Sequence, residues 1–431
     1  MKIAVWNDLP EPMRAEMLAR PPMDAADKDF HKSVQDIITA VRQDGDDALR
    51  GFAQRFDNVT LNNIAVPVAE IAQAAEGIET EAREAIDAAF ATIKMFHEHQ
   101  GYQPYSVETR PGVVCQRTVR PVERVGLYVP GGTAPLISTA LMLGVPSLLA
   151  GCPVRIMCTP CSPQGRVNPH ILYAAKLCGI EQVFRAGGAQ AIAAMAYGTQ
   201  SVPKVDKIFG PGSARVTLAK TLVAQDALGA AIDMPAGPSE VCVIATDDTN
   251  PVFAAADLLA QAEHDTAAHV VLIAFSEHKV QQILQQMAQQ LPKLPSAEIA
   301  AQAIKNSVAL IAQDKAQALH IANEYAPEHL ILCFDEAESW LPDIKTAGSV
   351  FLGPYTPETA GDYASGTNHV LPTYGYARAY AGLSVEQFQR SMTVQSLTEG
   401  GLKGLAPSLL TLARLEGLEA HAQAVLVRLK P

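Results

Sequence analysis

The chain has 431 residues, of which 48% are hydrophobic and 18% charged, a composition typical of globular proteins that excludes a disordered or fibrous chain. Lysine and arginine number 33 against 45 for aspartate and glutamate, so the net charge is −12. An acidic chain repels phosphate backbones and anionic lipids, which argues against nucleic-acid and membrane partners, whereas a small cationic substrate is compatible.

The cysteines and the apolar segments indicate the cellular compartment of the protein. Seven cysteines, an odd number, are spread along the chain, which predicts free thiols in a reducing compartment. The apolar run near the start spans only residues 3–6, too short for a signal peptide. Prolines and glycines interrupt the uncharged stretch 125–154, so it cannot form one continuous spanning helix. We therefore expect a cytoplasmic protein.

The spacing of apolar residues predicts helices first and then alternating strands and helices. Residues 22–100 are expected to be mainly helical, because apolar residues recur there at helical spacing. Short β-rich runs follow at 125–129, 154–158, 182–185, 207–209, 241–245, 270–274, 307–311, 330–334 and 349–351. Helices are predicted between them at 138–149, 170–178, 189–197, 213–222, 251–264, 278–291 and 315–325. This alternation predicts an α/β protein with largely parallel sheets.

The stretch after about Gly382 is again predicted to be helical. Leu409, Leu412 and Leu418 belong to an apolar stripe that continues toward the end of the chain. A segment of roughly fifty residues makes only a thin core by itself. It must therefore dock on the body of its own chain or on a second subunit.

Three glycine turns stand between a predicted strand and a predicted helix, at 126–132, 184–190 and 208–213. Glycine lets the backbone approach a phosphate, and the following helix presents free N–H groups. None of the three matches G-x-G-x-x-G. One alone is better explained as an ordinary turn, but three in one region make a nucleotide site an equal alternative.

Candidate ligands and acid/base groups stand at the ends of predicted elements. Gln261 and His264 are three residues apart, so both are expected on one face near the end of a helix. On spacing alone, a surface glutamine beside a helix-terminal histidine explains them better. Glu328 and His329 precede a strand, and a histidine or a desolvated glutamate suits general-base catalysis near neutral pH. A turn with two solvated side chains is the alternative.

A polar, glycine-broken segment follows the last predicted strand and offers two more candidates. Asp362 could bind a metal and His369 a substrate, since long polar loops between buried elements are often functional. His421, by itself, would be a surface or packing residue in a C-terminal helix. Cys158 and Cys161 lack a second ligand pair for a zinc site, so the thiols are expected to pack.

In their order and number, these motifs resemble the histidinol dehydrogenase family. The resemblance runs from about residue 25 to 431, and its most specific stretches are 125–136 (VGLYVPGGTAPL), 187–191 (GGAQA), 201–212 (SVPKVDKIFGPG), 233–240 (DMPAGPSE), 260–264 (AQAEH), 323–330 (NEYAPEHL) and 360–371. It implies oxidation of L-histidinol through L-histidinaldehyde to L-histidine, the final steps of histidine biosynthesis. It further implies that two NAD are reduced, that one Zn²⁺ is held per subunit, and that two subunits of a homodimer share the active site.

The resemblance also implies roles for individual residues. The implied zinc ligands are Gln261, His264, Asp362 and, from the other subunit, His421. Glu328 and His329 match the acid/base pair, in which His329 takes the hydroxyl proton and Glu328 helps to activate water. The implied substrate contacts are Ser239, Gln261, His264, His329, Asp362, His369, Glu416 and His421. The implied NAD contacts are Tyr128, Gln190 and Ser213, and the last of these departs from the asparagine that is frequent in the family.

The family's fold implies two incomplete Rossmann-like domains with parallel-rich sheets, plus helical N- and C-terminal extensions used in dimerisation. An incomplete nucleotide domain accounts for the missing G-x-G-x-x-G. The expected parts are an N-terminal helical arm (1–25), a larger α/β domain with the metal and acid/base residues (26–124 and 238–381), an NAD-binding domain (125–237) and a C-terminal dimerisation segment (382–431).

Three alternatives stay open at this point. A relative on the same scaffold would act on another amino alcohol or a sulfonate, but His369, Glu416 and His421 argue against it. A zinc hydrolase would use Glu328 and a metal-bound water, yet it has no need of three glycine turns. A ligand-binding protein without activity would leave Glu328 and His329 unexplained.

Overall fold

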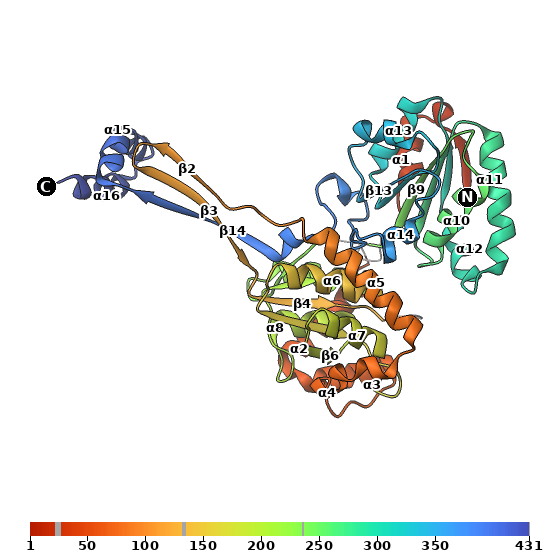
Figure 1. Ribbon diagram of the computed structural model, residues 1–431, viewed down its shortest axis with the longest axis horizontal. Coiled ribbons are helices and arrows are strands. Elements are labelled where there is room, and N and C mark those ends of the chain that lie inside the picture. Colours follow the sequence, from red (N-terminus) through yellow and green to blue (C-terminus); the bar gives the residue numbers. More distant parts are fainter. Residues whose placement is uncertain (22–26, 132–134, 235–236, 431) are drawn as a thin grey trace.

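The computed structural model describes residues 1–21, 27–131, 135–234 and 237–430. These residues form two layered bodies, each built on a parallel sheet, and an arm built on an antiparallel sheet (Figure 1). Within the described part of the chain, no helix combines the length and the apolar character that crossing a membrane requires.

The first body is built on a parallel sheet of six strands. In spatial order these are β1 (Lys2–Val5), β11 (Val308–Ile311), β10 (His269–Ala274), β9 (Glu240–Ala245), β12 (His329–Leu332) and β13 (Ser349–Leu352). Alternate side chains of β9 face opposite cores, with Val243 on one side and Ile244 on the other. The first core is closed by α10 (Pro251–Ala262), α11 (Glu277–Gln290) and α12 (Ala297–Lys305), and the second by α1 (Glu11–Leu18) and α13 (Lys315–Tyr325).

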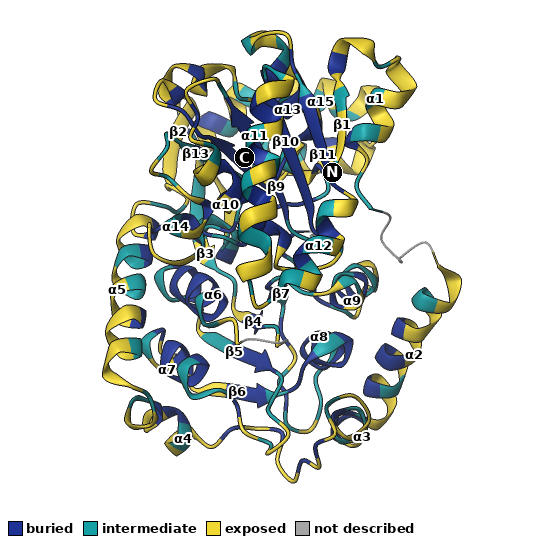
Figure 2. Ribbon diagram, turned by 90° about the vertical axis from the view of Figure 1, so that its right-hand side faces the viewer, coloured by how far each residue is buried: buried dark blue, intermediate teal, exposed yellow. Residues whose placement is uncertain are grey.

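The second body is built on a parallel sheet of five strands. Their order is β6 (Gln182–Arg185), β5 (Val154–Thr159), β4 (Arg124–Tyr128), β7 (Lys207–Phe209) and β8 (Ala231–Ile232). One face packs on α5 (Thr80–His97), α6 (Ile137–Leu149) and α7 (Pro169–Leu177), beside which lies α4 (Val68–Ala72). The other packs on α2 (Lys28–Asp44), α3 (Asp46–Asp57), α8 (Gly188–Tyr197) and α9 (Ala214–Gln225). Figure 2 shows these strands and helix faces as buried layers.

The arm projects away from both bodies (Figure 1). Its antiparallel sheet has the order β14 (Gln389–Leu397), β3 (Val113–Pro121) and β2 (Tyr105–Arg110), and its tip carries α15 (Glu399–Leu415) and α16 (Glu419–Leu429). Nearly all residues of β2 and β14 are exposed. The segment after Gly382 therefore contains a nine-residue strand before its helices, which the prediction of a helical extension missed.

The predicted α/β class with two parallel sheets is confirmed. Every predicted strand and helix of the middle region is present, with ends shifted by a few residues. The prediction missed β1, β2, β3, β8 and β14, which are short, lie at sheet edges or stand in the exposed arm. Exposed strands lack the buried apolar run that made the other strands visible in the sequence.

The helices of residues 28–97 pack differently from the predicted grouping. Val34 and Ile37 of α2 share a core with Ile156 of β5, and Ile93 of α5 shares one with Val125 of β4. These helices thus cover the five-stranded sheet. The domain expected from the family resemblance instead combines residues 26–124 with residues 238–381. An amphipathic helix pattern tells which face is buried but not which sheet it is buried against. We propose boundaries that assign these helices to the body of the five-stranded sheet.

The N-terminal segment also differs from the expected helical arm. Strand β1 pairs with β11 at the edge of the six-stranded sheet, and Leu18 of α1 is buried in a core of that body. The described part of this segment is therefore an integral part of the first body.

Candidate active site

The acid/base candidates lie at the amino ends of the strands of the six-stranded sheet. His329 is the first residue of β12, and Glu240 is the first residue of the adjacent β9. Helix α10 returns to this same edge and ends at Ala262. In open α/β sheets, ligands usually bind at the carboxyl ends of strands, so a search guided by that rule would miss this edge.

Glu328 and His329 are buried, with 6% and 4% exposure, so the alternative of a turn with solvated side chains is wrong. Both are bound by the backbone of Glu240. Its N–H donates to Glu328 Oε2 at 2.8 Å, and its carbonyl oxygen lies 3.1 Å from His329 Nδ1, which donates to it. His329 Nε2 is buried without a hydrogen-bond partner and lies 3.7 Å from Asp362 Oδ1. The ring therefore presents an unprotonated nitrogen to the site.

Burial sets the protonation of this pair. It lowers the pKa of His329 to about 3, and the nearby His264 and His369 act in the same direction. It raises the pKa of Glu328 well above its usual 4.5, an effect to which the Glu240 and Asp362 carboxylates add. Burial thus keeps the His329 imidazole neutral, so that its unpartnered nitrogen can accept a proton.

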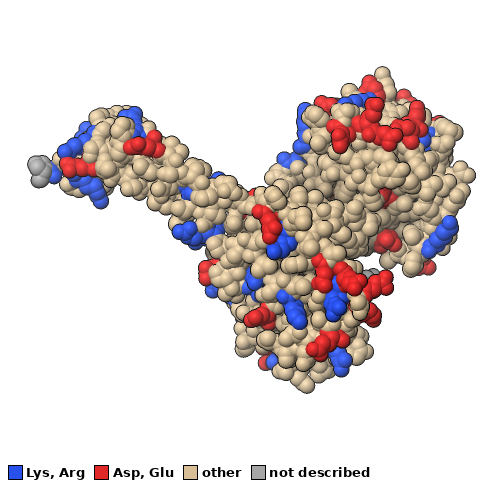
Figure 3. Space-filling model, viewed as in Figure 1, with Lys and Arg blue, Asp and Glu red and all other residues tan. Residues whose placement is uncertain are grey.

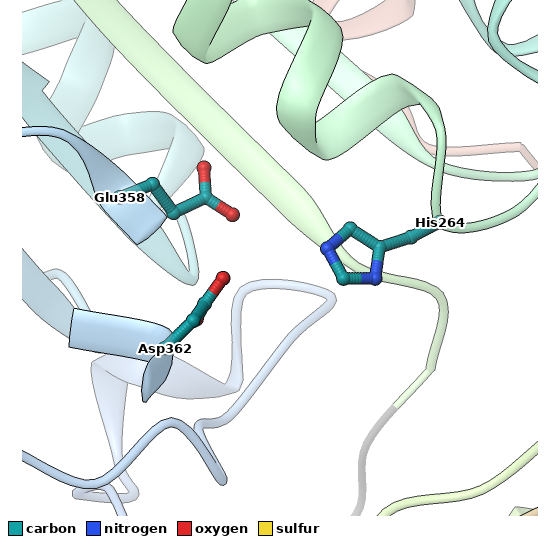
Figure 4. A group of neighbouring side chains, drawn as sticks. All are labelled: His264, Glu358 and Asp362. Atoms are coloured by element: carbon teal, nitrogen blue, oxygen red, sulfur yellow. The ribbon is translucent and has the colours of Figure 1, made fainter. Parts of the chain in front are cut away.

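A cluster of potential metal ligands adjoins His329. Ligand atoms of His264, Glu358 and Asp362 lie within 4.8 Å of one another (Figure 4). Glu358 and Asp362 are four residues apart on α14 (Glu358–Tyr363), so both project from one face of that helix. The sequence predicted a helix that includes His264, but α10 ends at Ala262 and His264 lies just beyond it. Its side chain faces the two carboxylates (Figure 4).

Gln261 also reaches this cluster. It is buried in the last turn of α10, and its amide, oriented by its neighbours, donates from Nε2 to the Glu358 carboxylate. In this orientation its Oε1 shares the Glu240 N–H with Glu328, at 2.9 Å, whereas a bound cation would take the oxygen and reverse the amide. Three of the four predicted metal ligands of this chain are thus brought together, and Glu358 joins them.

Glu358 was missed by the sequence analysis. Its signal in the sequence is the Glu358-x-x-x-Asp362 spacing, which places two carboxylates on one helix face. Its side chain is almost fully buried, and burial raises its pKa well above 4.5. Burial likewise raises the pKa of Asp362 to about 7. No lysine or arginine among the described residues pairs with either carboxylate, so a bound cation would offset their mutual repulsion.

Two of the predicted substrate contacts border the same cluster. His369 Nδ1 lies 2.7 Å from the carbonyl oxygen of Asp362, and its Nε2 lies 3.2 Å from Thr139 Oγ1. Burial lowers the pKa of His369 to about 4, so its ring is neutral. Ser239 directly precedes Glu240 at the start of β9 and is partly exposed.

Glu416 and His421 are not brought to this cluster within one chain. Both are exposed at the tip of the arm. Glu416 lies between α15 and α16, and His421 lies within α16. Figure 1 places that tip far from α10 and α14.

The predicted NAD contacts gather at the other body. Tyr128, Gln190 and Ser213 line one cavity of about 1310 Å³ at the carboxyl ends of the five-stranded sheet. The Tyr128 hydroxyl accepts the Gly188 N–H at 2.9 Å, which joins the first two glycine turns. Ser213 is exposed to the cavity and directly precedes α9, with no side-chain capping bond.

The third glycine turn is held by a buried ion pair. Asp233 accepts the Gly210 N–H at 2.8 Å, Lys220 Nζ donates to the Gly210 carbonyl at 2.8 Å, and the two side chains pair with each other. Gly210 has φ +124°, and a Cβ there would lie 2.2 Å from the Tyr128 carbonyl oxygen. Only glycine fits position 210 of this turn.

Known proteins match this chain over its whole length. A family model described as histidinol dehydrogenase matches residues 20–429. The histidinol dehydrogenases of Vibrio parahaemolyticus and Xylella fastidiosa are 49% and 52% identical, and each alignment covers 100% of this chain and 99% of the relative. The crystal structure of histidinol dehydrogenase from Elizabethkingia anophelis superposes with a TM-score of 0.94 at 44% identity, covering 100% of this chain and 98% of that one. Full-length identity near one half, together with the same fold, shows that this chain belongs to the histidinol dehydrogenase family.

Proposed function

We propose that the chain oxidises L-histidinol to L-histidine with two NAD at the cluster around His329. Histidinol dehydrogenases use Zn²⁺ and NAD, and both have candidate sites in this chain. The observation that carries the proposal is the buried, unpartnered His329 Nε2 beside the ligand cluster of His264, Glu358 and Asp362. A base aimed at a site for a divalent cation suits proton removal from an alcohol.

The donor set fits Zn²⁺. We propose Gln261, His264 and Asp362 as ligands, with His421 of the partner subunit as the fourth, a mixture of nitrogen and oxygen donors. Glu358 contacts Gln261 and stands within reach of the same ion. When bound, the ion holds and polarises the amino alcohol.

The residues of the chain then move the protons. In the first oxidation, His329 Nε2 takes the hydroxyl proton while the carbinol carbon gives a hydride to the nicotinamide, leaving the aldehyde. In the second, Glu328 takes a proton from the water that adds to the aldehyde carbon. The resulting hydrate gives a second hydride to a second NAD, loses its remaining hydroxyl proton to solvent and becomes the carboxylate. Ser239, His369 and, from the arm, Glu416 are proposed to orient the substrate.

The NAD would bind in the cavity lined by Tyr128, Gln190 and Ser213. Backbone N–H groups of the glycine turns and the start of α9 face phosphate groups favourably. A serine at position 213 keeps a hydroxyl for this contact but reaches less far than asparagine.

We further propose a homodimer in which the arm of each chain completes the partner's site. The arm exposes large apolar side chains, among them Tyr105, Val107, Met392, Leu412 and Leu415. Much of its surface between the tip and the body is uncharged (Figure 3). Such a surface is typical of an interface between subunits. The seven free cysteines support the expected cytoplasmic location.

The proposed function is tested by following NADH formation with purified, zinc-loaded protein. We expect two NADH per L-histidinol consumed, loss of activity on chelation and recovery with Zn²⁺. No NADH from L-histidinol and NAD would overturn the proposal. Calorimetric titration with NAD separates the hydrolase alternative, which predicts no NAD binding in the presence of substrate.

A further inference from the structure

We propose that the buried ion pair of Arg20 and Glu240 positions the acid/base pair Glu328 and His329, so that the N-terminal segment is a working part of the active site. This inference rests on the proposed function of that site. It gives a role to Arg20 and Glu240, to which the family resemblance assigned none.

The ion pair is geometrically well defined. Arg20 Nε and Nη2 donate to Glu240 Oε1 and Oε2, both at 2.8 Å, which gives a bidentate pair. The two side chains are 11% and 1% exposed. The guanidinium also lies over the Tyr325 ring, 3.9 Å from its centre. A pair with this much burial and this many contacts holds its partners in one arrangement.

Glu240 connects this pair directly to the acid/base residues. Its backbone N–H binds Glu328 and its carbonyl oxygen binds His329 Nδ1, as described above. The His329 contact keeps the proton on Nδ1 and leaves Nε2 free as the base. The Glu240 side chain is fixed from both sides, since the Tyr374 N–H also donates to its Oε1 at 2.7 Å. Anchoring this side chain therefore fixes the backbone groups that orient both acid/base residues.

Arg20 also binds the turn that carries the pair. Its Nη2 donates to the carbonyl oxygens of Tyr325 and Ala326, at 2.7 and 3.3 Å, just before Pro327 and Glu328. Ala326 has φ +51°, a left-handed conformation that is strained for any residue with a Cβ. One guanidinium thus joins the strained turn to the start of β9, the two backbone segments between which the acid/base pair is held.

Arg14 provides a matched control in the same segment. It donates from Nε to the Trp6 carbonyl oxygen at 3.2 Å and lies over the Trp6 ring at 5.3 Å. It is thus also a partly buried arginine on an aromatic ring, but none of its described contacts involves the residues around His329.

The test compares zinc-loaded Arg20→Met, Arg20→Lys and Arg14→Met with the unchanged protein. We expect Arg20→Met to lower kcat by about ten- to hundred-fold, the usual effect of removing a residue that orients an active-site group without touching the substrate. The KM for NAD should change less than about twofold, because neither Arg20 nor Glu240 lines that cavity. Zinc content is measured on the same samples, so that kcat is compared per zinc-loaded site. Arg20→Lys keeps the charge but loses the bidentate geometry, so its kcat should be intermediate. Arg14→Met should leave kcat unchanged.

A measurement independent of activity accompanies the kinetics. Nitrogen-15 chemical shifts of His329, assigned with His329→Asn, should report a proton on Nδ1 in the unchanged protein and a mixture of the two tautomers in Arg20→Met and Arg20→Lys. Failure of the unchanged protein to oxidise L-histidinol would count against the proposed function, whereas the tautomer shift would still decide the role of Arg20.

Two results would overturn the inference. The first is an unaltered kcat and tautomer in a folded Arg20 variant. The second is a loss of kcat that occurs equally in Arg14→Met and follows the fall in melting temperature. If Arg20→Met does not fold, Arg20→Lys decides between these outcomes.

Discussion

At His329, burial and one hydrogen bond decide which ring nitrogen can accept a proton. The Glu240 carbonyl holds Nδ1–H, and burial lowers the pKa of the ring to about 3, so the imidazole stays neutral. Replacing the ring with Asn removes the basic nitrogen while keeping a side-chain donor for Glu240.

We predict that His329→Asn lowers kcat by about 10²–10⁴-fold, the usual contribution of a general base, with zinc content near normal. Steady-state NADH formation and elemental analysis of the same sample measure both quantities. Activity that survives the substitution would exclude His329 as the base.

Glu358 allows a second test at the scale of one side chain. It contacts Gln261 and lies with His264 and Asp362 in the ligand cluster, so its negative charge favours a bound cation. We predict that Glu358→Gln weakens zinc binding by about 10–100-fold in a competition with a chelator. Asp46→Asn is the control, because Asp46 is a buried carboxyl on α3, in the other body and outside the cluster. Equal zinc affinity in Glu358→Gln and the unchanged protein would remove Glu358 from the metal site.

The sequence was informative about some residues and silent about others. His264, Asp362 and His329 could be named because family motifs carried them, whereas Glu358 and Arg20 stood outside every motif. Their importance comes from contacts between distant segments, such as the 220 residues that separate Arg20 from Glu240. Spacing along the chain cannot reveal such contacts.

At the scale of elements, α3 is fastened to the second body by a buried carboxylate. Asp46 accepts hydrogen bonds from Thr199 Oγ1 at 2.6 Å, from Ser201 Oγ at 2.5 Å and from Ser201 N at 3.1 Å. Burial acts to raise its pKa, but these bonds outweigh it and hold the pKa below its usual 3.8. A lowered pKa in the folded state means that the stabilisation is present above the usual value and is lost as pH falls through the folded pKa.

We predict that Asp46→Asn costs about 1–3 kcal/mol of unfolding free energy at neutral pH and progressively less in acid. Urea unfolding at neutral pH and at a pH below the usual carboxyl pKa of 3.8 measures the difference. Asp47→Asn is the control, since Asp47 is exposed and pairs only with Arg50 among the described residues. Equal stability of both variants at neutral pH would show that Asp46 does not fasten α3.

The turn at Gly210 tests the nucleotide cavity. A Cβ at this position would lie 2.2 Å from the Tyr128 carbonyl oxygen, and its φ of +124° excludes other residues without strain. We predict that Gly210→Ala raises the KM for NAD at least about tenfold, because strain of 1–3 kcal/mol must displace the turn. Gly51→Ala on α3, where nothing lies within 4 Å of a new Cβ, should leave it unchanged. An unaltered KM in Gly210→Ala would argue against NAD binding at this turn.

Element prediction succeeded where burial and periodicity coincide. The buried strands β4 to β7 and β9 to β13 were visible as short apolar runs, because strands of parallel sheets are covered on both faces. Strands β1, β2 and β14 are largely exposed, so no run covered on both faces marked them. The position of the acid/base pair at the amino ends of strands was equally hidden, since the usual rule points to the opposite edge.

At the scale of the whole molecule, the arm holds two of the proposed site residues away from the others. Its sheet and helices expose large apolar side chains, and Glu416 and His421 stand at its tip, away from the residues with which they are proposed to act. The family resemblance predicted sharing between subunits, but composition and length alone pointed to self-sufficient domains. The helices of 28–97 show the same limit, because apolar periodicity did not reveal which sheet they cover.

Sharing of the active site between two chains is tested most directly with a mixed dimer. His329→Asn and His421→Asn chains carry different affinity tags, are co-expressed, and the species bearing both tags is isolated. In such a dimer one site combines both substitutions and the other combines neither. We predict that each parent dimer is inactive and that the mixed dimer forms NADH from L-histidinol at about half the rate of the unchanged dimer. A mixed dimer as inactive as its parents would contradict a site completed by the partner subunit.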